Sequence, residues 1–458
     1  MKVSTRRVPL PEAAEMSREM ARRLEEFVQP ILQELDERAD VRLVETFAAT
    51  VVAIVRQRDR ELSLLLSELG ALIAGDEHAP AGVKRLWRLL SSPDYQADLV
   101  DRWLADQAGA AIARAEAVDG IAFAVLDDSE IEKPAAKELD GLSMVRSARA
   151  QRLHRAAGGP PPARPTVVPG FGWVALVVTG LSGAFTLARL HWFSPKLAEG
   201  AERQREAEWH TIVPFLLLWG QRVVWVVDRG FATAAFLGAA FARVRFLARW
   251  RSDYPLRDRT TGEIAAAGQL SKHVRSRWTA QIWHPWQRET WTVGVASLPV
   301  SLPADDRPLW LIVARRKGKS QTLWLLTSED ASTEAAALRL LRGYTRRWQV
   351  EWLFRFEKSE LGIQSVRLES WLYRDKLWRF PELVHAFLLS LLVALDTAAR
   401  ERLLQWCHRT GKRLREAIAP LYRLRRALGA VWEKHRPTIT LDRPALSRYV
   451  SHTRLFAC

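Results

Sequence analysis

The first 118 residues carry the spacing of amphipathic helices. Apolar positions recur every three or four residues over 18–38, 41–74, 82–91 and 94–116, which places them along one face of each helix. We therefore expect a mostly helical region that buries these faces and ends near residue 118, where the spacing changes.

From residue 119 the apolar positions form shorter runs, of the length of strands. The pattern predicts strands at 121–128, 172–179, 184–193, 223–228 and 244–249, with helices at 195–220 and 233–243. The stretch 147–170, rich in Arg, Gly and Pro, interrupts the pattern and is predicted to be a loop. Strands and helices in this order indicate a mixed α/β fold.

Two of these predicted strands end in aspartate residues. The run IAFAVL closes in the pair Asp127–Asp128, and VVWVV is followed by Asp228. In open α/β sheets ligands bind in the crevice outside the strand ends. An acid at a strand end also serves as a helix cap or a turn residue, and that alternative stays open for each strand alone.

The segment YTRRWQVEWLFRFEK (344–358) contains no Gly or Pro and is predicted to be one continuous helix. At ~100° per residue, Tyr344, Arg347, Glu351 and Lys358 fall within an arc of about 60°. One face then carries a hydroxyl, a guanidinium, a carboxylate and an ammonium in a column about 21 Å long. A solvated charged face is the plainer interpretation of such a helix.

Taken together, the acids favour metal chemistry. Two hard cations that sit ~3.5–4 Å apart need shared carboxylate oxygens, and two strand Asp with one helix Glu supply them. The 123 positions between Asp228 and Glu351 are too many for one helix and one strand. The segment 257–330 fills this interval with Trp-rich, β-branched runs at 277–283, 289–298, 309–315 and 321–327, which predict a β-rich insertion.

The insertion also carries candidate DNA contacts. Six of the 20 tryptophans lie in it, and Trp286 stands in a predicted loop where its ring would be available to stack on a flipped base. Most Trp residues in strands are core residues, so this role is a hypothesis for Trp286 alone. Arg315, Arg316, Lys317 and Lys319 form a basic tip that suits a phosphate backbone.

Charge is distributed unevenly along the chain. The net charge is +16, yet residues 1–119 hold 16 basic and 21 acidic side chains, whereas residues 120–458 hold 52 and 31. Such an excess of positive charge favours a polyanionic partner and salt-sensitive binding. The charge alone also fits an RNA-binding protein or a protein that binds anionic membranes. The two cysteines form no disulfide framework, and we expect a soluble, cytoplasmic protein without a membrane span.

These motifs resemble those of IS4-type DDE transposases. The signature Tyr-x2-Arg-x3-Glu-x6-Lys matches in full from Tyr344 to Lys358, and Asp-Arg-Gly-Phe at 228–231 resembles the second-acid motif. Asp-Asp-Ser at 127–129 resembles the first-acid motif, with Asp127 aligning better than Asp128 because the hydroxyl residue follows two positions after the ligand.

The resemblance implies a fold and a division of the chain. We expect an RNase H-like mixed sheet flanked by helices, with a β-rich insertion, an N-terminal helical region and a helical basic tail. The expected parts are an N-terminal helical region for end recognition (1–118), the first part of the catalytic core (119–256), the insertion (257–330), the core helix with its motif and a following helix at 380–400 (331–400), and the tail (401–458).

It also implies roles for single residues. Asp127, Asp228 and Glu351 would hold two Mg²⁺ ions, with Mn²⁺ as a substitute, for cleavage and strand transfer. Tyr344, Arg347, Lys358 and Arg229 would grip phosphates, although Arg229 is equally suited to pairing with a carboxylate.

The implied partner is double-stranded DNA, both the inverted-repeat ends of the element and its target, bound by a homodimer in a paired-end complex. Two alternatives stay open: a domesticated descendant that binds DNA without cutting it, and an RNase H-like nuclease that acts on host DNA.

Overall fold

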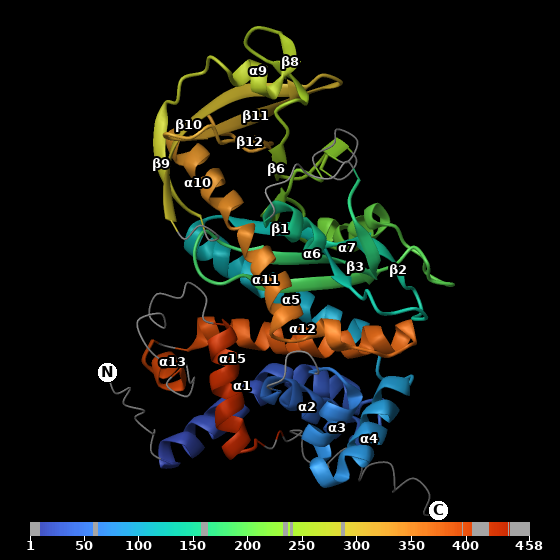
Figure 1. The fold of residues 1–458 in the computed structure, drawn as a ribbon. Coiled ribbons are helices and arrows are strands. Elements are labelled where there is room, and N and C mark those ends of the chain that lie inside the picture. The colour runs from blue at the N-terminus through green and yellow to red at the C-terminus, as the bar shows by residue number, and fades with distance from the viewer. Residues whose placement is uncertain are drawn as a thin grey trace, which may run out of the picture. The chain divides into compact units, whose positions relative to one another are not determined.

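The computed structural model describes residues 10–57, 63–156, 164–231, 237–238, 241–284, 289–395, 397–404, 421–437 and 439 (Figure 1). These divide into two compact units. The helical unit contains residues 1–104, 136–140 and 355–458, and the sheet unit contains residues 105–135 and 141–354. The chain passes from one to the other within helix α5 (Asp98–Asp119) and again within helix α11 (Trp348–Ser359).

Helices make up the helical unit. Besides parts of α5 and α11 they are α1 (Leu10–Asp36), α2 (Val41–Arg56), α3 (Leu66–Ala74), α4 (Ala79–Ser91), α12 (Trp371–Ala394), α13 (Thr397–Leu404) and α15 (Leu421–Lys434). The single helix predicted over 41–74 is wrong, because α2 and α3 are separate. The turn allows α3 to pack closely on α4, where a Cβ added to Gly82 would lie 2.0 Å from the carbonyl oxygen of Gly70.

Helix α12 is the most buried element of the helical unit. It is the one helix among the described residues long and apolar enough to cross a membrane, and 72% of its apolar window is buried, as in the core helix of a globular unit. Its buried Arg379 is paired with Asp101 at 2.9 Å and Glu382 at 2.9 Å. The predicted bounds 380–400 are wrong because the helix continues through Pro381 back to Trp371 and ends at Ala394.

The sheet unit contains one 12-stranded mixed sheet. Its order is β2-β3-β1-β5-β6-β12-β11-β10-β7-β8, with β4 also paired to β3 and β9 to β10. The strands are β1 (Ala122–Glu132), β2 (Ser143–Arg146), β3 (Val167–Thr179), β4 (Thr186–Phe193), β5 (Val223–Val227), β6 (Phe246–Trp250), β7 (Pro255–Asp258), β8 (Ile264–Ala266), β9 (Trp278–His284), β10 (Glu289–Leu302), β11 (Asp305–Arg316) and β12 (Thr322–Thr327). The expected mixed α/β architecture is confirmed.

The central strands are β1 and β5, which run parallel and are apolar because both faces of the sheet are covered. On one face, Ala124 and Leu126 share a core cluster with Ala207 and Phe215 of α7 (Gln204–Trp219). On the other face, Phe123 meets α10 (Glu334–Thr345) so closely that a Cβ on Gly343 would lie 2.2 Å from its ring. Helices α10 and α11 therefore lie opposite α7.

Three elements differ from the sequence-based expectation. Strand β1 does not end at its acids but continues to Glu132, because β3 pairs with it over its whole length. The predicted loop 147–170 contains helix α6 (Ala148–Ala156). This helix begins after Ser147, whose Oγ accepts a hydrogen bond from the Ala150 N–H at 3.0 Å, the arrangement of an N-cap. Helix α7 begins nine residues later than predicted, after Arg203.

The β-rich segment 257–330 is not a separate sheet. Its strand β12 pairs antiparallel with β6, from Trp324↔Trp250 to Thr327↔Leu247, so the hydrogen-bond ladder runs without interruption from β1 into β10 and β11. The short α9 (Ala267–Ser271) follows β8, and Trp324 donates from its indole N–H to Ser271 Oγ at 3.0 Å. The strands expected in this segment are present.

The close approach of α10 to β1 gives a stability prediction. Gly343→Ala places a methyl group 2.2 Å from a carbon of the Phe123 ring. This overpacking should lower the free energy of unfolding by about 1–3 kcal/mol. Gly109→Ala, in α5 with no atom within 4 Å of the added Cβ, is the matched control and should be neutral or stabilising by up to ~1 kcal/mol. Thermal unfolding followed by circular dichroism measures both, and equal melting temperatures would contradict the packing described.

Candidate active site

The register of two parallel strands brings the first two acids together. The pairing of β1 with β5 ends at Leu126↔Val227, so Asp127 and Asp228 are the next residues on neighbouring strands. Neighbouring strands lie about 4.8 Å apart. Asp127 also points to the face covered by α11, because side chains alternate along β1 and Leu126 faces α7.

One guanidinium links both strands to the helix. Arg347 is buried, and its Nη1 lies 2.6 Å from Asp127 Oδ2 while its Nη2 lies 2.9 Å from Glu351 Oε1 and 4.0 Å from Asp228 Oδ2. The planar fork of arginine suits such shared contacts, which a single ammonium point charge would not reproduce. Asp127, Asp228 and Glu351 thus converge on one cation.

Asp228 has further partners. The buried Tyr344 hydroxyl donates to Asp228 Oδ1 at 3.1 Å, and Arg249 Nη1 lies 3.6 Å from the same oxygen. Arg249 was not singled out in the sequence. It stands on β6, directly after the pair Val227↔Ala248, and the strand order β5–β6 would have been needed to find it.

The surroundings of Asp127 and Asp228 shift their pKa values in opposite directions. Burial raises the pKa of Asp127 to about 7, although Arg347 opposes this shift. Burial also acts on Asp228, but Arg347, the Arg229 N–H and Arg249 together hold its pKa below the ordinary value. The Arg347 pKa is raised because its burial is outweighed by Tyr344 and the three carboxylates. The site therefore contains one aspartate, Asp127, that is readily protonated and another, Asp228, that stays ionised.

The segment 344–358 is not a continuous helix, and that prediction is wrong. Helix α10 ends at Thr345 and α11 begins at Trp348, with a tight turn in which the Arg347 N–H bonds to the Tyr344 carbonyl at 3.0 Å. The turn sends two adjacent arginines in different directions. Arg346 reaches Thr179 Oγ1 and the Gly183 carbonyl, while Arg347 enters the acid cluster. Regular helix would not give both side chains these partners.

Asp128 lies on the opposite face from Asp127. Burial raises its pKa, and its polar neighbours are Arg205, Arg146 and Gln204, two of which belong to α7. The nearby Glu208 is buried against Arg205 at 2.6 Å, and burial raises its pKa to about 7. The structure therefore brings Asp127, and not Asp128, to Arg347.

Three further candidate residues are Arg229, Lys358 and Trp286. Arg229 is exposed on the turn after β5 and contributes its backbone N–H to Asp228. Lys358 lies in the last turn of α11, in the part that belongs to the helical unit. Trp286 lies outside the described residues.

Two of the four residues of the expected basic tip are engaged in internal contacts. Arg315 donates to the carbonyls of Val274, at 2.9 Å, and Ser271. Arg316 pairs with Glu289 at 2.6 Å and lies over the Trp291 ring at 4.2 Å, whereas Lys317 and Lys319 are exposed. Their contact with DNA stays a prediction.

An aromatic group beside the acids was missed. His284 stacks on Trp291 with ring centroids 4.0 Å apart and meets Trp348 edge-on at 4.7 Å. Trp348 precedes Glu351 by three residues on α11, so this group stands next to the acid cluster. Its members come from β9, β10 and α11, and only the sheet topology brings them together.

The three acids also fit a divalent metal ion. Carboxylate oxygens are the ligands of hard cations such as Mg²⁺, and three of them from different elements already converge on a single positive charge. The donor chemistry and the convergence therefore both suit an ion, with Arg347 supplying the balancing charge in this structure.

Comparison with known families agrees with the geometry. Residues 200–378 match the family model described as the transposase DDE domain. This range contains Asp228, Arg347 and Glu351 and begins after Asp127. No curated protein matches the chain. The match supports a DDE transposase, a class of enzyme that acts on DNA with divalent metal ions.

The central guanidinium gives a second prediction. Arg347→Ala leaves three neighbouring carboxylates without their shared partner and should lower the free energy of unfolding by ~3 kcal/mol at neutral pH. We expect the low end of the range for buried ion pairs, because Asp228 and Glu351 retain partial solvent contact. Arg339→Ala, on the exposed face of α10, is the control. Equal denaturation midpoints for the two variants would show that Arg347 does not hold the acids.

Proposed function

We propose that the protein is an IS4-type DDE transposase that cuts and rejoins DNA at the ends of its own insertion sequence. The observation that carries the proposal is the convergence of Asp127, Asp228 and Glu351, from two parallel strands and a helix, on Arg347. The family match over 200–378 supports the class of enzyme. The complete Tyr-x2-Arg-x3-Glu-x6-Lys spacing supports the IS4 type.

The strand order supports an RNase H-like core. Strands β4, β3 and β1 are antiparallel neighbours, and β5 and β6 follow parallel to β1. Asp127 lies on β1 and Asp228 follows β5. We propose that this five-stranded part is the catalytic core, and that β7 to β12 extend it towards the DNA.

Asp127, Asp228 and Glu351 would hold two Mg²⁺ ions, for which Mn²⁺ is a substitute. When bound, such ions activate an attacking oxygen and neutralise the charge on the leaving oxygen. Water, and later a DNA 3′-hydroxyl, attacks phosphorus in line; a new P–O bond forms as the bond to the leaving 3′-oxygen breaks. Tyr344 orients Asp228, and Arg347 would exchange its carboxylates for a phosphate of the DNA, an anion that also accepts two parallel N–H bonds from a guanidinium.

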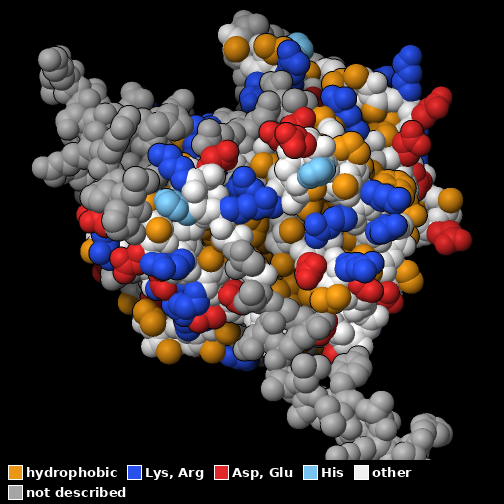
Figure 2. Space-filling view, turned by 90° about the horizontal axis from the view of Figure 1, so that it is seen from below, with side chains coloured by type: hydrophobic (Ala, Val, Ile, Leu, Met, Phe, Trp, Pro, Cys, Tyr) orange, Lys and Arg blue, Asp and Glu red, His pale blue; other side chains and the backbone are white. Residues whose placement is uncertain are grey.

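The proposed partner is double-stranded DNA, at the inverted-repeat ends and at the target. The excess of basic over acidic side chains in residues 120–458 supports it. On the face shown in Figure 2, Lys and Arg side chains are interspersed with acidic and apolar ones. The proposed DNA contacts therefore rest on Arg347, Lys358 and Lys317 and not on a basic patch of that face. A homodimer in a paired-end complex is part of the proposal.

One observation favours a second candidate. All three acids are already paired with Arg347, which is a stable arrangement for a descendant that binds DNA without cutting it. The two functions differ in whether the carboxylates are needed for more than folding. A cleavage assay with charge-neutral variants separates them.

Glu351→Gln should abolish DNA cleavage while DNA binding is retained. Gln keeps the size of the side chain but not the charge, so the Arg347 contact weakens and one oxygen ligand is lost. The assay follows nicking and double-strand breaks in a plasmid that carries the gene with its native flanks, in Mg²⁺ and in EDTA. Glu334→Gln, exposed in the first turn of α10, is the matched control and should cut like the wild type. Cleavage by the Glu351 variant would refute the proposal; binding without cleavage by the wild type would favour the non-cutting descendant.

The neighbouring aspartates provide a sharper comparison. Asp127→Asn should reduce cleavage to background, because it removes the carboxylate that faces Arg347. Asp128→Asn should retain activity within roughly 10-fold, since Asp128 faces α7. Both positions are next to each other on one strand, so local stability is matched, and thermal unfolding checks it. The reverse order of activities would assign the first acid to Asp128.

A further inference from the structure

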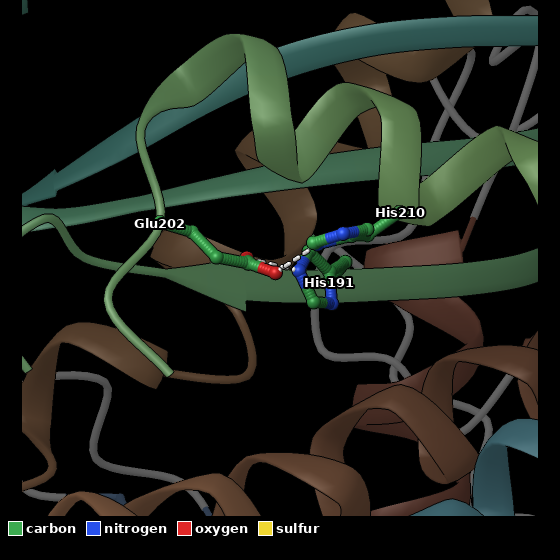
Figure 3. A group of neighbouring side chains, drawn as sticks. All are labelled: His191, Glu202 and His210. Carbon is green, nitrogen blue, oxygen red and sulfur yellow. Dashed lines mark hydrogen bonds and ion pairs between the residues drawn. The ribbon is translucent and has the colours of Figure 1, made fainter. Parts of the chain in front are cut away.

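A second group of metal-ligating side chains lies on the α7 side of the sheet. His191 belongs to β4, Glu202 to the segment between β4 and α7, and His210 to α7 (Figure 3). One ligand atom from each residue lies within 4.8 Å of the other two. The group shares no residue with the acid cluster around Arg347.

Glu202 stands between the two imidazoles. Its Oε2 lies 2.6 Å from His191 Nε2, and its Oε1 contacts His210 Nδ1. Figure 3 shows the carboxylate end of Glu202 directed at both rings. Burial alone would raise the pKa of Glu202, but the two histidines hold it below its ordinary value, so an ionised carboxylate is available as a ligand.

Backbone contacts hold the three residues in place. The Glu202 N–H bonds to the Ser194 carbonyl at 2.9 Å, which closes the segment after β4 into a loop. Arg189, on the same strand face as His191, donates to the carbonyl of His210 at 3.0 Å and so fixes that turn of α7 against β4. The His191 and Glu202 side chains are 17% and 15% exposed, whereas His210 is 62% exposed. The group is therefore preformed and open to solvent on one side.

The donor set differs in kind from that of the catalytic acids. Two imidazole nitrogens and one carboxylate oxygen are the ligands of Zn²⁺ and similar transition-metal ions, whereas Mg²⁺ prefers oxygen alone. A purely hydrogen-bonded triad has the same contacts, with two imidazole N–H groups donating to the carboxylate. The two states differ in whether one metal ion replaces the protons between the three ligands.

We propose that His191, Glu202 and His210 bind one Zn²⁺ ion, with a water molecule in the fourth position on the exposed side of His210. The inference does not depend on the proposed transposase function, because it uses none of the catalytic residues. The proposed site has two nitrogen ligands and one oxygen ligand, and it joins β4, the loop before α7 and α7 itself.

Such an ion would brace a helix that contacts both acid-bearing strands. Arg205, in the first turns of α7, donates to the Gly230 carbonyl two residues after Asp228, and it lies over the Phe231 ring at 5.5 Å. Arg205 and Gln204 also face Asp128, the neighbour of Asp127. The proposed role is therefore structural: the ion fixes the end of α7 that supports these two strands.

The test is a metal titration of the full-length, untagged chain after treatment with a chelator. Zn²⁺ binding is measured by calorimetry, and Co²⁺ is used as a coloured substitute whose absorption distinguishes a four-coordinate site with nitrogen ligands from an octahedral oxygen site. The titration is repeated in the Glu351→Gln background, which weakens the catalytic acids as a competing site. We expect one ion per chain, with the four-coordinate spectrum, in both backgrounds.

Two variants and one control decide the assignment. His210→Ala, at an exposed position that should not disturb folding, and Glu202→Gln should each weaken Zn²⁺ binding at least about 10-fold and remove the four-coordinate spectrum. His154→Ala, at another exposed histidine of the sheet unit, should bind like the wild type. Zn²⁺ should raise the melting temperature of the wild type and the His154 variant but not of the His210 variant. Unchanged affinity in His210→Ala and Glu202→Gln, or no four-coordinate spectrum in the wild type, would overturn the proposal and leave a hydrogen-bonded triad.

Discussion

The burial of one positive charge among three negative ones is the interaction on which this site depends. Three carboxylates held side by side would repel each other and pay a large desolvation cost, and Arg347 offsets both by contacting them from the centre. The same contacts tie β1 and β5 to the start of α11. Packing of α11 against these strands and assembly of the acids therefore support each other.

The two proposed metal-binding groups lie on opposite faces of one sheet. Alternation along β1 sends Asp127 towards α11 and Asp128 towards α7, and α7 also carries His210. The sheet thus separates an all-oxygen group from one that contains nitrogen, although both are built on the same few strands. This separation allows the two sets of ligands to differ in chemistry without competing for the same side chains.

Much of this arrangement could be predicted from the sequence, and the failures have physical causes. Strand β5 and its acid were predicted because an unbroken apolar run signals a strand buried on both faces. The turn at Arg346 and Arg347 was not, since both residues are good helix formers and only their tertiary partners break the helix. Arg249 and the aromatic group of His284 depend on which strands become neighbours, and local pattern does not encode that order.

The shared ladder of β6 and β12 limits how this protein can change. Because the strands of the β-rich segment are hydrogen-bonded into the same sheet as β1 and β5, this segment cannot swing on a hinge as an appended domain would. Deleting a single residue within β12 would reverse the faces of the side chains that follow it in that strand and so disturb its pairing with β6 and β11. The turns between the strands carry no such constraint. Insertions and deletions should therefore accumulate in turns such as the one after Arg316, while each strand keeps its number of residues.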